Sequence, residues 1–175
     1  MTEQYSQTVE VAVTSKTKAK QWIGIGMVLF SLGFLMLTIF LKWYFVFAFA
    51  VILTVGIIYI HNYNNTAKEY IYDFSPKRLV VAKKDVIGRT RRMLSLVYND
   101  VARCGLMEGL AVEGDIIACG ATHEQGVYQI IYKDGEITRR LLFSPDTYMI
   151  ALLKETLGEK MEITEAEIAE MAEAE

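Results

Sequence analysis

The sequence predicts an α+β membrane protein, in which a transmembrane helical hairpin is joined to a small antiparallel β-sheet or barrel closed by a C-terminal α-helix. Three observations predict this class. An apolar block runs from Trp22 to Ile60 with Lys42 as its only charge. Short segments of alternating polar and apolar residues follow it, and the last of them gives way to a helical period. Because 53% of the 175 residues are apolar and the excess lies in one block, neither a simple soluble globule nor a disordered chain is expected.

Residues 1–21 form an N-terminal segment with a strand-like pattern. Its apolar and polar side chains alternate from Tyr5 to Val13, which is the period of a half-buried strand and not of a membrane-surface helix. The sequence leaves open whether this strand pairs with the sheet predicted further along the chain.

The apolar block is too long for a single membrane crossing. A helix rises about 1.5 Å per residue and a bilayer core is about 30 Å thick, so about twenty residues suffice for one span. We therefore predict two spans, residues 22–41 and 43–60, with a tight turn near Lys42. Amphipathic side chains prefer the membrane interface, and five of them are expected to anchor the spans there: Trp22, Lys42, Trp43, Tyr44 and Tyr59.

Charge asymmetry predicts the orientation of the hairpin. Lys16, Lys18 and Lys20 precede the first span, and a cluster of lysines and arginines follows the second, whereas only Lys42 lies between them. The positive-inside rule then places both termini in the cytoplasm, with two spans in the cell membrane. Neither span contains an acidic residue, which argues against a self-contained transporter.

Residues 66–160 are predicted to form a cytoplasmic domain of short strands. Residues 98–104 fit either a short helical turn or a bent strand. The strongest hairpin signal is Asp134-Gly135, between the last two predicted strands. The expected strands cover residues 69–74, 78–84, 89–97, 104–112, 115–121, 126–134 and 136–143.

A helix of about fourteen residues should follow the last strand. Ser144 is a good N-cap, Pro145 fits the first helical position, and Asp146 favours the positive end of the helix dipole. Apolar residues recur on one helical stripe up to Leu157, and Gly158 can end the helix. This amphipathic helix is expected to close the open end of the sheet.

Three stretches carry a resemblance to a known family: YIYDFSPKRLVVAKK (70–84), RRMLSLVYNDVARC (91–104) and RRLLFSPDTYMIALLKETL (139–157). With the two spans, they resemble bacterial membrane proteins that carry a pleckstrin-homology-like domain. The chain is also similar to a domain-of-unknown-function family of small membrane proteins from Gram-positive bacteria. The resemblance implies a fold and no enzymatic activity, because this superfold carries many binding roles.

The segment 77–92 is strongly basic, with seven cations and one acid. In the resemblance it matches the strand–loop–strand that binds anionic headgroups in some pleckstrin-homology domains. Juxtamembrane cations are attracted to an anionic leaflet, but a topology signal on a solvated surface fits the same pattern. The candidate anion-binding residues are Lys77, Arg78, Lys83, Lys84, Arg89, Arg91 and Arg92.

Residues 161–175 form an acidic tail with six glutamates and no cation. Three interpretations stay open: a solvated and frayed tail, a cover for the basic segment, and a docking peptide for a partner.

No set of residues indicates catalysis or a bound cofactor. Cys104 and Cys119 are too few for a disulfide framework, and Cys119 with His123 is at best half of a metal site. No nucleophile elbow or phosphate-cradling glycine loop is present. A net charge of −3 argues against nucleic-acid binding. We therefore expect no enzyme, no cofactor, no metal and no small-molecule substrate.

The sequence supports two hypotheses about function. The first is a non-enzymatic membrane-anchored adaptor or binding module, which presents its domain at the cytoplasmic face to membrane lipids or to a protein partner. The alternative is an accessory subunit of a larger membrane complex, or a homo-oligomer, which makes its contacts through the glycine-rich hairpin. Gly26 and Gly33 would carry those contacts.

Overall fold

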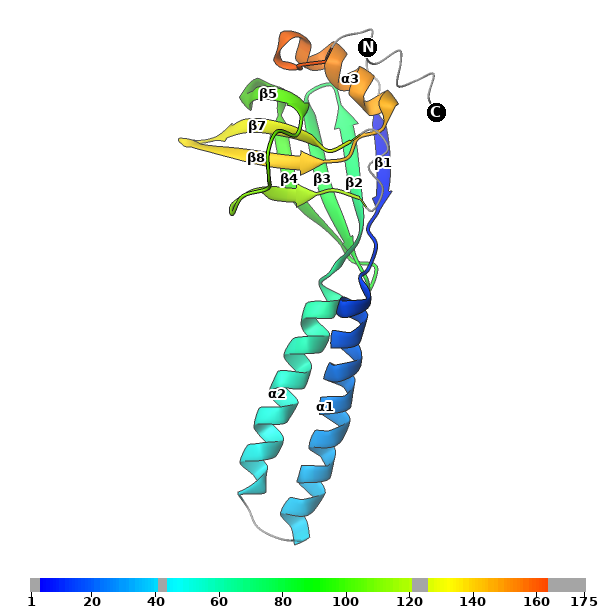
Figure 1. The fold of residues 1–175 in the computed structure, drawn as a ribbon, viewed down its shortest axis with the longest axis vertical. Coiled ribbons are helices and arrows are strands. Elements are labelled where there is room, and N and C mark those ends of the chain that lie inside the picture. Colours follow the sequence, from blue (N-terminus) through cyan, green and yellow to red (C-terminus); the bar gives the residue numbers. More distant parts are fainter. Residues whose placement is uncertain (1–3, 41–43, 121–125, 164–175) are drawn as a thin grey trace. The chain divides into compact units, whose positions relative to one another are not determined.

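The computed structural model describes residues 4–40, 44–120 and 126–163, and these form two compact units. The helical unit comprises Val13–Ala67 together with Asp85–Arg89, and the sheet unit comprises the other described residues. Figure 1 labels the elements of both. The chain leaves the sheet unit after its first strand and returns to it after two helices. The sheet unit is therefore assembled from segments on both sides of the helices in the sequence.

The helical unit contains α1 (Ser15–Phe40) and α2 (Phe45–Asn64). Both helices are long and apolar enough to cross a membrane, and only 11% and 6% of their most apolar windows are buried. A core helix of a soluble protein would be mostly buried, so these exposed apolar faces fit a lipid environment better. The helices extend beyond the predicted spans: α1 begins at Ser15 and takes in the three lysines, and α2 continues to Asn64.

Two glycines set the closest approach of α1 and α2. A Cβ atom built on Gly24 would lie 3.0 Å from the carbonyl oxygen of Gly56, and one built on Gly56 would lie 3.0 Å from that of Gly24. Gly26 and Gly33 are different, because a Cβ atom there would meet nothing within 4 Å. The first pair therefore packs the hairpin together, while the other two glycines lie on surfaces that α2 does not contact.

The first sheet has the order β1-β2-β3-β4 and is called sheet A. Its strands are β1 (Tyr5–Glu10), β2 (Ala67–Ser75), β3 (Arg78–Asp85) and β4 (Thr90–Val97). β1 is antiparallel to β2, from the pair Tyr5↔Phe74 to the pair Glu10↔Glu69. A hydrogen bond of 2.8 Å from the Val11 amide to the Lys68 carbonyl continues the ladder. The predicted N-terminal strand is thus confirmed, and it joins the sheet.

The second sheet has the order β5-β7-β8-β6 and is called sheet B. A 3₁₀ turn, η1 (Tyr98–Asp100), leads into it, which resolves the ambiguous segment. Gly135, with φ of 65°, turns the predicted β7–β8 hairpin. The strands are β5 (Val101–Leu106), β6 (Ile116–Ala118), β7 (Tyr128–Asp134) and β8 (Ile137–Phe143).

Two expectations about sheet B are wrong. The strand predicted over 104–112 ends at Leu106, and residues 107–115 form a loop in which Gly109 and Gly114 adopt positive φ. This loop carries the chain across sheet B, so that β6 runs parallel to β8. The sheet is therefore mixed and not wholly antiparallel.

The C-terminal helix α3 (Thr147–Leu157) is capped by Asp146, whose Oδ1 accepts a 2.8 Å hydrogen bond from the Met149 amide. Ser144, the predicted N-cap, lies two residues too early and is buried. Gly158 ends the helix with φ of 56°, as predicted, and a 3₁₀ turn, η2 (Gly158–Lys160), follows.

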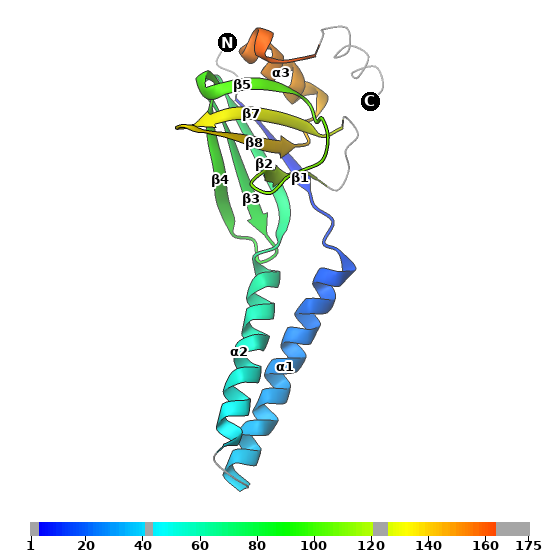
Figure 2. The same ribbon diagram turned by 60° about the vertical axis from the view of Figure 1, so that its left-hand side comes forward.

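One hydrophobic core joins both sheets and α3. Figures 1 and 2 show α3 across the end of the sheets at which β1 begins, and Met149, Ile150 and Leu153 are fully buried there. The described strands form two sheets on one core and no closed barrel. The residue segment after β6 contacts β1, although β6 and β1 belong to different sheets. Gly120 approaches β1 so closely that a Cβ atom would lie 1.9 Å from Cγ1 of Val9.

Candidate functional site

Most of the predicted anion-binding cations lie at the end of sheet A where β3 turns into β4. Lys83 stands directly opposite Arg91 in the antiparallel ladder. The side chains of Arg89, Arg91 and Arg92 are exposed, and Lys83 is half-buried. Like charges directly opposite each other destabilise a strand pair. Lys83 and Arg91 therefore repel each other across the ladder.

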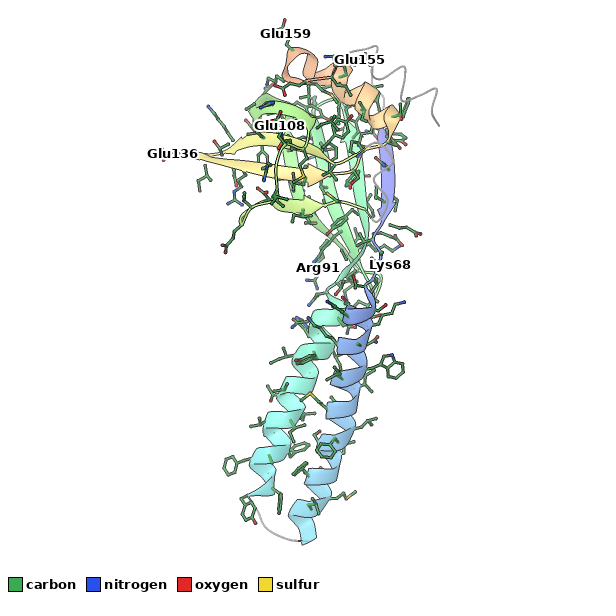
Figure 3. All side chains as sticks on the ribbon, in the orientation of Figure 1. Lys68, Arg91, Glu108, Glu136, Glu155 and Glu159 are labelled. Atoms are coloured by element: carbon green, nitrogen blue, oxygen red, sulfur yellow. The ribbon has the colours of Figure 1, made fainter. Side chains whose placement is uncertain are left out.

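Glu69 neutralises part of this end of the sheet. Its carboxylate lies 2.9 Å from Nζ of Lys84 and 3.3 Å from Nζ of Lys68. The hydrogen bond from Lys84, assisted by Lys68, holds the pKa of Glu69 below its usual range. Lys68 was not among the predicted site residues. Its position at the start of β2 places it at the same end as Arg91 at the start of β4, and Figure 3 labels both.

The turn between β3 and β4 is built around Asp85. The Asp85 amide donates to the carbonyl of Arg89 at 3.0 Å, and Asp85 Oδ1 accepts from the Arg89 amide at 2.8 Å. Gly88 adopts φ of 85°. The Val86 amide donates to the carbonyl of Thr66, just after α2, at 3.1 Å. The turn that carries Arg89 is thus fixed to the end of α2.

Lys77 and Arg78 lie at the opposite end of sheet A. Arg78 opens β3 and pairs with Val97, whereas Lys84 is near the other end of the strand and pairs with Thr90. At about 3.3 Å per residue, roughly 20 Å separate Arg78 from Lys84. The seven predicted cations therefore do not form one patch. Lys83, Lys84, Arg91, Arg92 and the added Lys68 belong to the sheet unit and are called the basic end, whereas Arg89 lies in the turn that belongs to the helical unit.

Arg140 holds the loop 107–115 on sheet B. Its guanidinium contacts Oδ2 of Asp115 at 2.5 Å and donates to the Leu110 carbonyl at 2.9 Å and to Gln129 Oε1 at 3.3 Å. The Asp115 side chain is only 5% exposed. The hydrogen bond from Arg140 holds the pKa of Asp115 below its usual range.

The same loop borders an open groove of about 570 Å³ in the sheet unit. Leu110 in this loop is 86% exposed. Two of the cations in the groove are paired, since Arg140 meets Asp115 and Arg139 lies 3.0 Å from Asp134. The groove is lined by Val112, Glu113, Gly114, Asp115, Ile131, Ile137, Thr138, Arg139 and Arg140.

The helical unit contains a second pocket, of about 400 Å³, between the start of α1 and the end of α2. Tyr59, one of the predicted interface anchors, lines it together with Thr17, Lys20, Asn62, Tyr63 and Thr66. The anchors Trp22 and Tyr44 are 69% and 51% exposed. Lys42 and Trp43 lie outside the described residues.

The two thiols lie in different surroundings. Burial raises the pKa of the Cys104 thiol to about 12, and burial also raises the pKa of the half-buried Cys119. His123, the other half of the possible metal site, lies outside the described residues. In the part of the chain that the structure describes, no three His, Cys, Asp or Glu side chains come together.

The acidic tail is described only at its start. Met161 forms a parallel bridge with Cys104 at the edge of β5, and the Glu162 amide donates to the Cys104 carbonyl at 2.8 Å. The Glu162 carboxylate lies 2.5 Å from Nε of Arg103. The first residues of the tail thus extend sheet B, and residues 164–175 lie outside the described part.

Comparison with protein-family models, with curated proteins and with solved structures gave no significant match.

Proposed function

We propose that the protein is a non-enzymatic, membrane-anchored binding module. Two spans hold it in the cell membrane with both termini in the cytoplasm, and its basic end contacts the anionic headgroups of the inner leaflet. The two sheets with a helix across one end are compatible with a pleckstrin-homology-like domain. β4 is the outer strand of sheet A, so it also offers an edge to which a protein partner can add a strand.

The observation that carries the proposal is the place of the basic end along the chain. β2 begins at Ala67, and only Asn65 and Thr66 separate it from Asn64, the last residue of α2. The three Cα–Cα steps from Asn64 to Ala67 span at most about 11 Å. The start of β2 is therefore tethered within about 11 Å of a helix end that, in a membrane, lies at the headgroup level. The end with Lys77 and Arg78 is a full strand length further from this tether.

Electrostatics support the same assignment. Each cation close to an anionic leaflet gains about 1 kcal/mol, or roughly a fivefold effect on an equilibrium. The exposed Arg89, Arg91 and Arg92 lack a described carboxylate within ion-pair distance. Lipid phosphates would supply anions to these three arginines.

Hydrogen exchange on the full chain in nanodiscs tests this proposal. The amides of residues 86–94 should exchange more slowly in discs that contain phosphatidylglycerol than in discs of phosphatidylcholine alone. High salt should remove the difference, because it screens exposed charges. The double variant Arg91→Gln/Arg92→Gln should also remove this difference in exchange. At about 1 kcal/mol per cation, the two substitutions weaken the contact with the anionic leaflet more than tenfold.

Lys77→Gln/Arg78→Gln is the matched control, because it removes two exposed cations from the opposite end of sheet A. It should behave as the unchanged protein. The lipid assignment is wrong if the unchanged protein exchanges equally in both discs, or if the control variant loses the difference to the same extent.

A second candidate function is that of an accessory subunit which associates through the hairpin. Gly26 and Gly33 favour it, because they are one heptad apart and meet nothing within 4 Å. Gly26→Leu and Gly33→Leu should then abolish co-purification with partner subunits or with a second copy, while Arg91→Gln/Arg92→Gln should keep it. The reverse result would exclude this candidate.

A further inference from the structure

The pocket between α1 and α2 has a structural cause in the helix packing. The two helices touch at Gly24 and Gly56. Thr17 and Lys20 precede Gly24 by seven and four residues, so they lie on the same face of α1. Tyr59 and Tyr63 follow Gly56 by three and seven residues and share a face of α2.

About one helical turn from the glycines, before Gly24 in α1 and after Gly56 in α2, the same faces carry the large side chains of Lys20 and Tyr59. Because a glycine contact cannot continue between Lys20 and Tyr59, the helix ends separate there, as Figure 2 shows for the ends next to β1 and β2. The pocket of about 400 Å³ lies between the start of α1 and the end of α2, where the larger side chains stand. All six lining residues belong to the helical unit.

The lining is rich in hydrogen-bond donors and has no carboxylate. It offers the ammonium of Lys20, the phenol groups of Tyr59 and Tyr63, the amide of Asn62 and the hydroxyl of Thr17. Among the described residues, the side chains of Lys20, Tyr59 and Tyr63 make no hydrogen bond or ion pair. A cation with several unused donors and no competing acid suits an oxyanion with several acceptor oxygens.

The depth of the pocket restricts the source of that oxyanion. Lys20 lies two residues before Trp22, where the uncharged stretch of α1 begins, and Tyr59 lies near the end of the uncharged stretch of α2. Lysine and tyrosine at such positions occupy the headgroup level of a bilayer. Lipid phosphates lie at that level, and basic pockets between membrane helices are suited to phospholipid headgroups.

We propose that this pocket binds the phosphate of one anionic phospholipid. The Lys20 ammonium pairs with the phosphate, Tyr59, Tyr63 and Asn62 donate hydrogen bonds to its oxygens, and the acyl chains lie against the exposed apolar faces of the helices. This site goes beyond the proposed function. It uses none of the cations of the basic end. The pocket would hold a single lipid, whereas the basic end would contact many lipid headgroups.

Native mass spectrometry of the full chain in a neutral detergent tests the site. Phosphatidylglycerol and phosphatidylcholine are titrated separately, and the population with one bound lipid is counted. The unchanged protein should bind the first phosphatidylglycerol in preference to phosphatidylcholine. Lys20→Gln should weaken that first binding about fivefold, the effect of one cation. Tyr59→Phe/Tyr63→Phe should weaken it further, and Lys20→Arg should restore it.

Lys18→Gln is the matched control, because Lys18 is an exposed lysine on the same helix that does not line the pocket. Tyr44→Phe serves the same purpose for the tyrosines. Both should bind as the unchanged protein does. Equal losses in Lys18→Gln and Lys20→Gln would overturn the site and leave only diffuse attraction, and so would an equal affinity for the two lipids.

Inorganic phosphate distinguishes a lipid from a free anion. If millimolar phosphate displaces the lipid and protects the fold of the lipid-free chain against heat in a Lys20-dependent manner, the pocket binds free phosphate and the lipid assignment is wrong. The Arg91→Gln/Arg92→Gln variant should keep the first lipid. Failure of this site is therefore distinguishable from failure of the basic end, which is read by hydrogen exchange in nanodiscs.

Discussion

Arg140 shows how a single residue organises one face of sheet B. It joins β8 to Asp115 and to two loop carbonyls, those of Glu108 and Leu110. The Val112 amide also donates to Asp115 Oδ2, at 2.8 Å. One carboxylate therefore links the guanidinium to the loop backbone.

The lowered pKa of Asp115 gives a prediction about acid. Because its pKa is lower in the folded protein than in the unfolded chain, the ionised carboxylate stabilises the loop above about pH 4, and this contribution is lost as the pH falls through the folded pKa. The amides of residues 107–115 should therefore lose protection from hydrogen exchange below about pH 4, while the β7–β8 ladder keeps its protection.

Asp115→Asn provides the control for the acid experiment. This variant removes the titrating group, so its loop should already be less protected at neutral pH and should show no further change in acid. Equal loop protection in Asp115→Asn and in the unchanged protein at neutral pH would contradict the assigned role of Asp115.

Residue-level prediction from sequence succeeded for local signals and failed for distant partners. Gly158 and the Asp134-Gly135 turn act through their own backbone, and both are found as expected. Asp146, and not Ser144, caps α3, because the helix begins at Thr147. The bond between Arg140 and Asp115 joins residues 25 apart in the chain, and no local pattern indicates such a pair.

At the level of elements, β1 is the most informative strand. It belongs to sheet A although two helices separate it from β2 in the chain. Val11 and Lys68 are still joined across the ladder. In topological terms, the helical hairpin therefore replaces the turn of an ordinary β-hairpin.

This arrangement predicts that the sheet unit can be made soluble. Replacing residues 12–67 by Asn-Gly would join Val11 to Lys68 through a two-residue turn, the commonest hairpin connection. The product should be a soluble, folded protein with a cooperative thermal transition, followed by circular dichroism.

The matched control is a fragment that starts at residue 66 and lacks β1. It loses the six paired positions of the β1–β2 ladder and the burial of Val9, a cost on the order of 5 kcal/mol. Since small domains are stable by only about 5–15 kcal/mol, this fragment should unfold at a much lower temperature or aggregate. Equal stability of the two proteins would show that β1 does not contribute to the sheet unit.

The strands were predictable where polar and apolar residues alternate, as in β1 and β2. The segment 104–112 was not, because its apolar residues suggested a strand while Gly109 and Gly114 turn the backbone and Arg140 holds it as a loop. The parallel pairing of β6 with β8 follows from that loop, so the same residues also make sheet B mixed. The candidate site was predictable as residue types, and only the strand register separated Arg78 from the basic end.

For the whole molecule, the pairing of β1 with β2 constrains the membrane topology. Neighbouring strands of one sheet lie on one side of a membrane, so the chain between them crosses it an even number of times. Two spans satisfy this condition. Together with the lysines at the start of α1, it predicts that both termini are cytoplasmic.

Reporter fusions check this topology. A reporter that is active only in the cytoplasm should work at either terminus, and it should fail when the chain is cut after residue 42 and fused there. Activity at only one terminus would contradict the pairing of β1 with β2 in the membrane-inserted protein, because the two strands would then lie in different compartments.

The pairing of β1 with β2 can form only late in synthesis, because both helices lie between the two strands in the chain. β1 is made first and has no partner until both helices and β2 have followed it. A chain in which α2 fails to insert leaves β1 and β2 in different compartments, with the edge of β2 unpaired and the core without the burial that Val9 provides. Such a chain exposes apolar surface to proteases, whereas a correctly inserted one buries it. In a chain whose two helices cross a membrane, the sheet is therefore completed only after both crossings.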